Sequence, residues 1–384
     1  MSASALTARA ALRLLALCAL AAAQALSTAP AGTAAPAADE AVSYYALADF
    51  QRIDKIDAHV HLHGRGERFM AQAIADRFRI LTINVDYPDY PPVAEQQRAA
   101  ISLRERYPGR VAFAATFTVE GFQSPGWSQA AIRHIDEARA HGAVGVKLWK
   151  NVGMALRDPD GSYVMPDDPR LEPIIAHLES SSLVLLGHQA EPLNCWLPFE
   201  KMTVRSDREY FRAHPQYYMY RHPEMPSHDA ILAARDRMLR AHPRLRFDAV
   251  HLASLEWDVD RVGAFLDSFP NAVVDLAARL VHLEYQAASD PEKVRRFLIR
   301  YQDRILYGSD VDYGPAEPSA AEMAALHGGW LNDWRFLATS EQMHSPEFEP
   351  GFHGLHLPRT VLERIYHGNA EALFTNAWNT SAPR

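Results

Sequence analysis

Two histidines, His59 and His61, stand two residues apart in a run of apolar and β-branched residues that predicts a β-strand. Side chains two positions apart on a strand project from the same face, so both imidazoles can approach one point. Imidazole nitrogens are common ligands of divalent metal ions. The pair alone could arise by chance, because the chain contains 18 histidines.

Three further residues of metal-binding type, His188, His251 and Asp310, each end an apolar, strand-like run later in the chain. Imidazole and carboxylate ligands from several strands, with one position left for water or substrate, are typical of a catalytic rather than a structural metal site. The five residues together therefore predict one catalytic centre that holds a divalent metal ion.

Apolar and β-branched runs alternate along the chain with segments of helical periodicity. Strands are predicted at residues 53–59, 80–85, 111–117, 144–149, 183–188, 245–251, 272–276 and 305–310, and helices include 128–141, 171–180, 228–242, 259–269 and 291–301. Eight strand–helix units in one domain predict an α/β fold, the closed (β/α)₈ TIM barrel, whose active site lies where the strands end. An open doubly wound sheet, the alternative, would need a glycine-rich turn after the first strand.

Two connections are long, namely residues 189–226 after the fifth strand and residues 311–357 after the eighth. Both are expected to overhang the barrel mouth as lids, although their aromatic residues equally suit a subunit interface and hence a homodimer. Trp196 in the first connection and Arg279, just beyond the seventh strand, are predicted to contact substrate. An arginine can bind a substrate carboxylate through two hydrogen bonds, and a surface ion pair is its alternative role.

The first 25 residues have the pattern of a secretory signal peptide. Two arginines precede an apolar stretch at 14–23, and residues 23–25 (Ala-Gln-Ala) match an A-x-A cleavage site. The stretch is shorter than the roughly 20 residues of a membrane-spanning helix, so cleavage is favoured over an anchor. We therefore predict an exported protein, periplasmic or secreted, with a signal peptide at 1–25, a flexible leader at 26–45 and a barrel domain at 46–378.

Acidic and basic residues are mixed along the chain, and the formal net charge is -8. Without a basic block, the sequence argues against a nucleic-acid partner. The expected partner is a small-molecule substrate, and no stable membrane insertion is expected after cleavage. Only Cys195 would remain in the mature chain, so no internal disulfide is expected.

The sequence resembles the amidohydrolase superfamily of metal-dependent TIM barrels, in particular the branch related to aminocarboxymuconate-semialdehyde decarboxylase. The motifs that carry this resemblance, between about residues 54 and 374, are Asp57–His61, Gly187-His188 with Glu191-Pro192, His251, Gly308–Asp310 and His367–Ala370. The resemblance implies that His59, His61, His188 and Asp310 hold the metal. It also implies that Asp310 can accept a proton and that His251 transfers a proton or binds a second ion.

Lys147, near the end of the fourth strand, departs from the one-metal pattern of that branch. In two-metal members of the superfamily, a carbamylated lysine at this place bridges the ions. The resemblance therefore implies one divalent ion, with Zn²⁺ the favoured identity, or two ions with a carbamylated Lys147. An ordinary charge partner for the lysine is the alternative.

These expectations favour a hydrolase, in which a metal-activated water attacks an amide, ester or lactone of a small organic substrate. A non-oxidative carboxy-lyase is the competing reaction, with His251 handling the proton that replaces carbon dioxide. A barrel that only binds a metal is disfavoured, because it has no use for an open coordination position beside His251.

The cleavage motif predicts that the protein purified from its native host begins near Leu26. N-terminal sequencing measures this, with the chain made without export as the uncleaved reference. An intact Met1 on the mature protein would contradict the predicted signal peptide.

Overall fold

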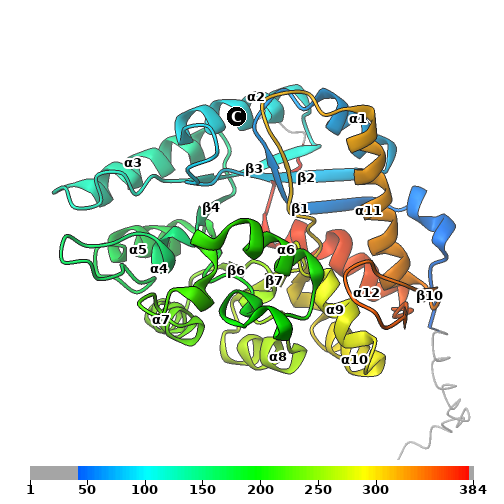
Figure 1. The fold of residues 1–384 in the computed structure, drawn as a ribbon. Coiled ribbons are helices and arrows are strands. Elements are labelled where there is room, and N and C mark those ends of the chain that lie inside the picture. The colour runs from blue at the N-terminus through cyan, green and yellow to red at the C-terminus, as the bar shows by residue number, and fades with distance from the viewer. Residues whose placement is uncertain (1–41, 380–384) are drawn as a thin grey trace, which may run out of the picture. The chain divides into compact units, whose positions relative to one another are not determined.

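The computed structural model describes residues 42–379, so the predicted signal peptide and most of the predicted leader lie outside the described residues. A parallel sheet forms the centre of this part, and each of the first eight strands pairs with its neighbour in the chain (Figure 1). The strands are β1 (Lys55–Leu62), β2 (Phe78–Ile83), β3 (Val111–Thr116), β4 (Gly145–Leu148), β5 (Val184–Gly187), β6 (Phe247–Ala249), β7 (Ala272–Asp275), β8 (Ile305–Leu306) and β9 (Val311–Tyr313).

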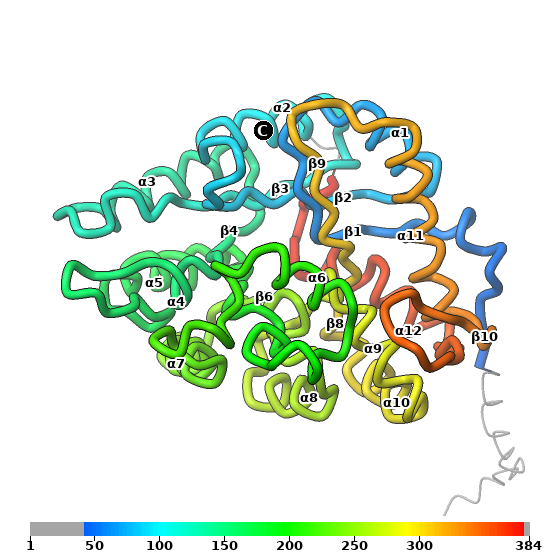
Figure 2. Tube along the Cα trace, viewed as in Figure 1, coloured from blue at the N-terminus to red at the C-terminus, as the bar shows by residue number. Residues whose placement is uncertain are grey.

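The sheet closes into a barrel because the eighth strand is divided into two parts. β8 pairs with β7, whereas β9 pairs with β1 and runs beside it in Figure 2. Between the two parts, the amide of Asp310 donates to the carbonyl of His59 over 2.8 Å. The predicted (β/α)₈ barrel is therefore confirmed.

Helices connect successive strands around the outside of the sheet. They include α1 (Glu67–Ala75), α2 (Val93–Arg106), α3 (Trp127–Ala140), α5 (Glu172–Ser181), α7 (His228–Ala241), α8 (Val259–Ser268), α9 (Leu280–Ala287) and α10 (Pro291–Arg300). The five helices predicted from periodicity begin and end within one residue of these bounds. Each buries an apolar stripe, such as Ile135 and Ala138 of α3, as an amphipathic surface helix must.

Apolar side chains form two layers, one between the sheet and the helices and one inside the barrel. The outer layer includes Ile80, Val111, Val146, Leu185 and Phe247, and the inner layer includes Leu81, Ala112, Leu186, Val250 and Leu306. Residues 370–378, with most of α13 (Asn369–Leu373), complete the inner layer at the start of the strands. There Nε1 of Trp378 donates to the carbonyl of Ile80 over 3.1 Å. This end of the barrel is filled, which leaves the opposite end for a site.

A bulge in β1 turns two predicted ligands into the barrel. The pairing of β1 with β2 changes register between Asp57 and Val60. Ala58 belongs to the inner layer but Val60 belongs to the outer layer, so the two faces of the strand exchange at this point. His59 and His61 consequently face inward beyond the bulge, a device often found next to active sites.

The long connections contain more regular structure than predicted. The first includes α6 (Arg205–Ala213), and the second includes the 19-residue helix α11 (Ala320–Ala338) and a hairpin of β10 (Gln342–Met343) and β11 (Phe352–His353). Instead of overhanging the mouth, α11 packs against α1 and donates from Nε1 of Trp330 to Oδ2 of Asp57 over 3.0 Å. Its buried residues at 323, 326, 330, 334 and 337 have helical spacing, a signal that the sequence already contained.

The folded unit begins before the predicted boundary at residue 46. Tyr44 bridges to Pro358, and Tyr45 is buried with its ring centroid 5.5 Å from that of Trp334. Residues 42–45 therefore belong to the barrel domain rather than to the leader. In the part of the chain that the structure describes, no helix has the length and apolar composition needed to span a bilayer.

Candidate metal centre

His59, His61 and Asp310 bring three potential ligand atoms together where the strands end. Oδ1 of Asp310 lies 3.3 Å from Nε2 of His59 and 3.2 Å from Nε2 of His61. Potential ligand atoms of the three residues all lie within 4.8 Å of one another. Gly308 permits this approach, since a Cβ there would lie 2.8 Å from Cβ of His59.

Both imidazoles are oriented so that Nε2 is available to a ligand. Nδ1 of His59 lies 2.6 Å from Oδ2 of Asp275, and Nδ1 of His61 lies 2.8 Å from the carbonyl oxygen of Ile83. Because both oxygens accept hydrogen bonds, each Nδ1 carries the ring proton and each Nε2 keeps its lone pair. Contacts of this kind orient most metal-binding histidines.

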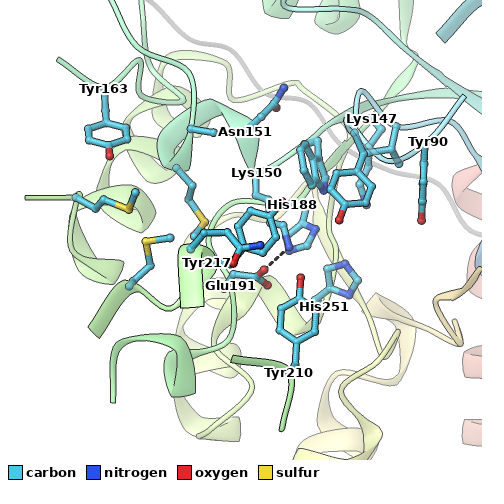
Figure 3. A pocket seen from close by; sticks show the side chains of 18 of the residues that line it. Tyr90, Lys147, Lys150, Asn151, Tyr163, His188, Glu191, Tyr210, Tyr217 and His251 are labelled. Carbon is cyan, nitrogen blue, oxygen red and sulfur yellow. Dashed lines mark hydrogen bonds and ion pairs between the residues drawn. The ribbon is translucent and has the colours of Figure 1, made fainter. Parts of the chain in front are cut away.

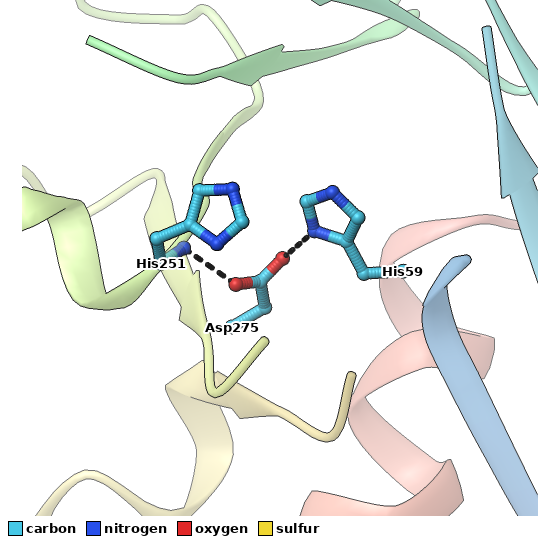
Figure 4. Close-up of side chains that lie close together, drawn as sticks. All are labelled: His59, His251 and Asp275. Atoms are coloured by element: carbon cyan, nitrogen blue, oxygen red, sulfur yellow. Dashed lines mark hydrogen bonds and ion pairs between the residues drawn. The ribbon is translucent and has the colours of Figure 1, made fainter. Parts of the chain in front are cut away.

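Asp275, at the end of β7, joins two of the predicted site residues (Figure 4). Its Oδ2 accepts from His59, and its Oδ1 accepts from the backbone amide of His251 over 2.6 Å. Burial raises the pKa of this carboxyl group, but the interactions with His59 and His251 together outweigh burial and leave the pKa below its ordinary value. Asp275 therefore stays ionised and fixes His59 relative to the end of β6.

His251 presents a neutral ring to the same place. Its ring centroid lies 4.8 Å from that of His59, and its Nδ1 donates to the carbonyl of Ala277 over 2.9 Å. Burial holds the pKa of this imidazole well below its ordinary value, so Nε2 keeps a lone pair. His251, His59 and Asp275 form a second group of potential ligand atoms. The arrangement is chemically suited to both predicted roles of His251, proton transfer and binding of a second ion.

His188 lies beside this cluster but outside its closest group. Its ring centroid is 4.2 Å from that of His251. Its Nε2 is buried and has no hydrogen-bond partner among residues 42–379. A buried nitrogen without a partner is unfavourable, and a metal ion held by the four predicted ligands would supply one. The donor set of three imidazoles and one carboxylate therefore fits a divalent metal ion.

Lys147 reaches the same place from β4. Its buried Nζ lies 3.2 Å from Nε2 of His59. Burial lowers the pKa of this amine to about 8, against the opposing effect of the carboxylates of Asp310 and Asp275. These carboxylates favour the ammonium form of the lysine over an anionic carbamate, because like charges repel.

The backbone is strained at four strand ends around the site. The φ angle is 70° at Ala190, 60° at His251, 53° at Ala278 and 66° at Asp310. Non-glycine residues are uncommon in this left-handed region, and each costs on the order of 1–3 kcal/mol. Such strain persists only where the surrounding structure imposes it, and it is frequent at functional sites.

A cavity of about 570 Å³ opens at this end of the barrel (Figure 3). Its wall includes the predicted site residues His61, Lys147, His188, His251 and Asp310. Much of the remaining wall is aromatic or apolar, including Tyr87, Tyr90, Trp149, Tyr210, Tyr217 and Met219. Since the last three come from the connection after β5, that connection covers the cavity. The volume suits a small organic molecule.

Arg279 and Trp196, predicted to contact substrate, are not among the described residues that line this cavity. Arg279 is buried and donates from Nη1 to the carbonyl of Ala278 over 2.9 Å. Trp196 donates from Nε1 to the carbonyl of Pro226 over 3.3 Å and packs edge-on against His228. The sequence could not predict this, because the direction of a loop beyond a strand end does not follow from sequence distance.

The sequence analysis missed Asp275 and the ion pair between Lys150 and Glu191 in the cavity wall. Asp275 had a signal, since it is a carboxylate at the end of the otherwise apolar run 272–276. Lys150 and Glu191 follow neighbouring strands, and nothing local to either residue shows that they meet. The pairing of β4 with β5 brings the two residues together, and that pairing is a tertiary contact.

The fold and the site define the class of the protein: a parallel (β/α)₈ barrel with histidine and aspartate side chains that could hold a metal where its strands end. A family model described as amidohydrolase matches residues 56–375. The chain therefore belongs to this amidohydrolase family. Members of the family are enzymes, hydrolases and decarboxylases among them, and usually depend on divalent metals. No curated protein sequence matches the chain.

Solved structures share the fold at low sequence identity. A 2,6-dihydroxybenzoate decarboxylase in complex with 2,6-dihydroxybenzoate is 14% identical, with a TM-score of 0.50 over 84% of this chain and 99% of that one. An uncharacterised TIM-barrel protein from Bordetella bronchiseptica is 15% identical, with a TM-score of 0.49 over 85% and 100% of the two chains. A 4-oxalomesaconate hydratase from Rhodopseudomonas palustris is 12% identical, with a TM-score of 0.46 over 83% and 95%.

The contacts of Asp275 predict a loss of metal affinity in the Asp275→Asn variant. The amide can donate to Nδ1 of His59, which would move the ring proton to Nε2 and remove the lone pair that a metal needs. We expect Zn²⁺ affinity, measured by competition with a chelator, to fall by about 10- to 100-fold.

Asp248→Asn is the matched control for that measurement. Asp248 lies on the neighbouring strand β6, and its buried carboxyl oxygens have no hydrogen-bond partner in the described part of the chain. Burial, together with the nearby Asp275, raises its pKa well above the ordinary value, so an amide of the same size replaces a protonated acid. Equal losses in the two variants would contradict the role assigned to Asp275.

Proposed function

We propose that the protein is a metal-dependent hydrolase that acts on an amide, ester or lactone of a small organic substrate. His59, His61, His188 and Asp310 would hold the ion, for which Zn²⁺ is the favoured identity given three imidazoles and one carboxylate. When bound, such an ion polarises a carbonyl group and lowers the pKa of water to roughly 7.

The placement of Asp310 is the observation that carries this proposal. Its Oδ1 lies between the two imidazoles of β1, while no hydrogen bond to its Oδ2 occurs within the described residues. The residue lines the cavity, and its side chain is 28% exposed. Oδ2 is thus available to accept a proton from a water molecule that attacks a substrate at the mouth.

His251 can complete the proton transfer. Its Nδ1 is occupied by the carbonyl of Ala277, so Nε2 is the nitrogen that can exchange a proton in the cavity. A proton taken from water by Asp310 can be returned through Nε2 of His251 to the leaving group, which keeps the reaction balanced. Asp275 supports this step by fixing the backbone of His251.

A carboxy-lyase is the second candidate, and the composition of the cavity wall favours it. Aromatic side chains, including Tyr87, Trp149 and Tyr217, provide flat surfaces for an aromatic acid, and Lys147 provides a cation for its carboxylate. In that reaction His251 would supply the proton that replaces carbon dioxide. One of the solved structures with this fold is named as a decarboxylase of a dihydroxybenzoate.

An activity screen of the zinc-loaded protein over lactones, esters, amides and aromatic carboxylates tests the proposal. We expect hydrolysis without release of carbon dioxide, and a loss of about 100-fold or more in kcat for Asp310→Asn, because that variant lacks the proton acceptor. The double variant His59→Ala/His61→Ala should lose metal and activity together. Release of carbon dioxide from an aromatic acid, without hydrolysis, would favour the carboxy-lyase instead.

The metal stoichiometry depends on Lys147. We expect one ion per chain, and retention of that ion by Lys147→Ala, because the neighbouring carboxylates favour the ammonium form. Elemental analysis with and without bicarbonate measures this. A rise towards two ions with bicarbonate, loss of one ion in Lys147→Ala, and partial rescue of that variant by short carboxylic acids would instead indicate a bridging carbamate.

A further inference from the structure

The cavity wall carries one ion pair that the proposed reaction does not use. Lys150 follows β4 and Glu191 follows β5, and Nζ of Lys150 donates to Oε1 of Glu191 (Figure 3). The Glu191 side chain is 8% exposed and the Lys150 side chain is 20% exposed. The pair is therefore largely shielded from water. Opposite charges interact more strongly in such a place than on an exposed surface.

The segment that carries Glu191 is fixed on both sides. The hydroxyl of Ser254 donates to the carbonyl of Ala190 over 2.8 Å, and the amide of Leu193 donates to Oε1 of Glu256 over 2.8 Å. If Glu191 turned away, the charge of the partly buried Lys150 would lose its partner, which is unfavourable. The ion pair is thus a constant feature that a substrate must meet.

The other cations of the wall lie elsewhere. Among the described residues that line the cavity, the cations are Lys147, Lys150 and Arg157. Lys147 belongs to the candidate metal centre, and the exposed Arg157 donates to the hydroxyl of Tyr163. Lys150 is neutralised by Glu191. Away from the metal centre and from Arg157, the described part of the wall therefore offers no unpaired positive charge to a second anionic group.

We propose that the Lys150–Glu191 ion pair determines substrate specificity: the cavity accepts a planar molecule with one anionic group and an uncharged hydrogen-bonding group at its other end, and rejects a dianion. An uncharged hydroxyl or amide can donate to Glu191 and accept from Lys150. A second carboxylate would face the carboxylate of Glu191, and the repulsion between these like charges would weaken binding. The inference rests on the proposed function only in treating this cavity as the substrate site.

Binding of two probes to the zinc-loaded full chain tests this inference without turnover. The probes are 4-hydroxybenzoate, a monoanion, and terephthalate, a dianion of similar length. We expect isothermal titration calorimetry to show at least about 10-fold tighter binding of 4-hydroxybenzoate, because terephthalate meets Glu191. Glu191→Gln keeps the size of the side chain, removes its charge and frees Lys150, so the affinity ratio should fall to about 1 or below.

Two further variants complete the experiment. Glu200→Gln removes the same charge from an exposed position of the same connection, outside the residues that line the cavity, and should leave the ratio unchanged. Lys150→Met leaves the charge of Glu191 without its partner and should increase the ratio of the two affinities. This variant tests the inference even if Glu191→Gln does not fold. Metal content is measured first in each variant.

Any of three results would overturn the inference. The wild-type protein could bind the two probes equally, the affinity ratio could stay unchanged in Glu191→Gln, or neither probe could bind to the metal-loaded protein. If the protein binds 4-hydroxybenzoate more tightly than terephthalate but has no hydrolytic activity, the inference is supported. Only the proposed function is then contradicted. Discrimination in the wild-type protein that Glu191→Gln abolishes, with metal content retained, is the supporting result.

Discussion

One buried carboxylate, that of Asp275, holds the candidate site together. Each of its oxygens has a separate task, since Oδ2 accepts from the ring of His59 and Oδ1 accepts from the amide of His251. The hydrogen bond between Oδ2 and the ring of His59 sets the tautomer of His59, and thereby leaves the lone pair on Nε2 for a metal. A ligand from the first strand and a proton-transfer candidate from the sixth thus depend on one residue of the seventh.

The closed barrel explains why such charged groups can be buried here. The inner layer is apolar near the start of the strands, where the C-terminal residues fill the barrel, and polar near their ends. His59, Lys147 and Asp275 are all buried at that polar end, where each charge has an opposite or hydrogen-bonding neighbour. Separated from one another, these groups would each carry a large desolvation cost. Their grouping is therefore both a condition of folding and the origin of the site.

The cavity combines this centre with walls of different chemistry. The strand ends supply the ionisable groups, whereas the connection after β5 supplies aromatic and apolar side chains such as Tyr210, Tyr217 and Met219. Strained backbone at Ala190, His251 and Asp310 aims strand-end residues into this space. Chemistry and selectivity thus come from different elements, so the connection can change its specificity without altering the centre, as in other barrels.

The barrel could be predicted from the sequence, because alternating strand and helix periods are local patterns that can be recognised without tertiary contacts. The same patterns put His59, His61, His188, His251 and Asp310 at or near strand ends. Helix α11 could also have been predicted from the spacing of its apolar residues. Three features depend on contacts between distant segments: the bulge that turns His59 inward, the hydrogen bond from His59 to Asp275, and the ion pair of Lys150 with Glu191. Arg279 and Trp196 do not line the cavity for the same reason: contacts between distant segments depend on loop direction and strand register, which local sequence patterns do not encode.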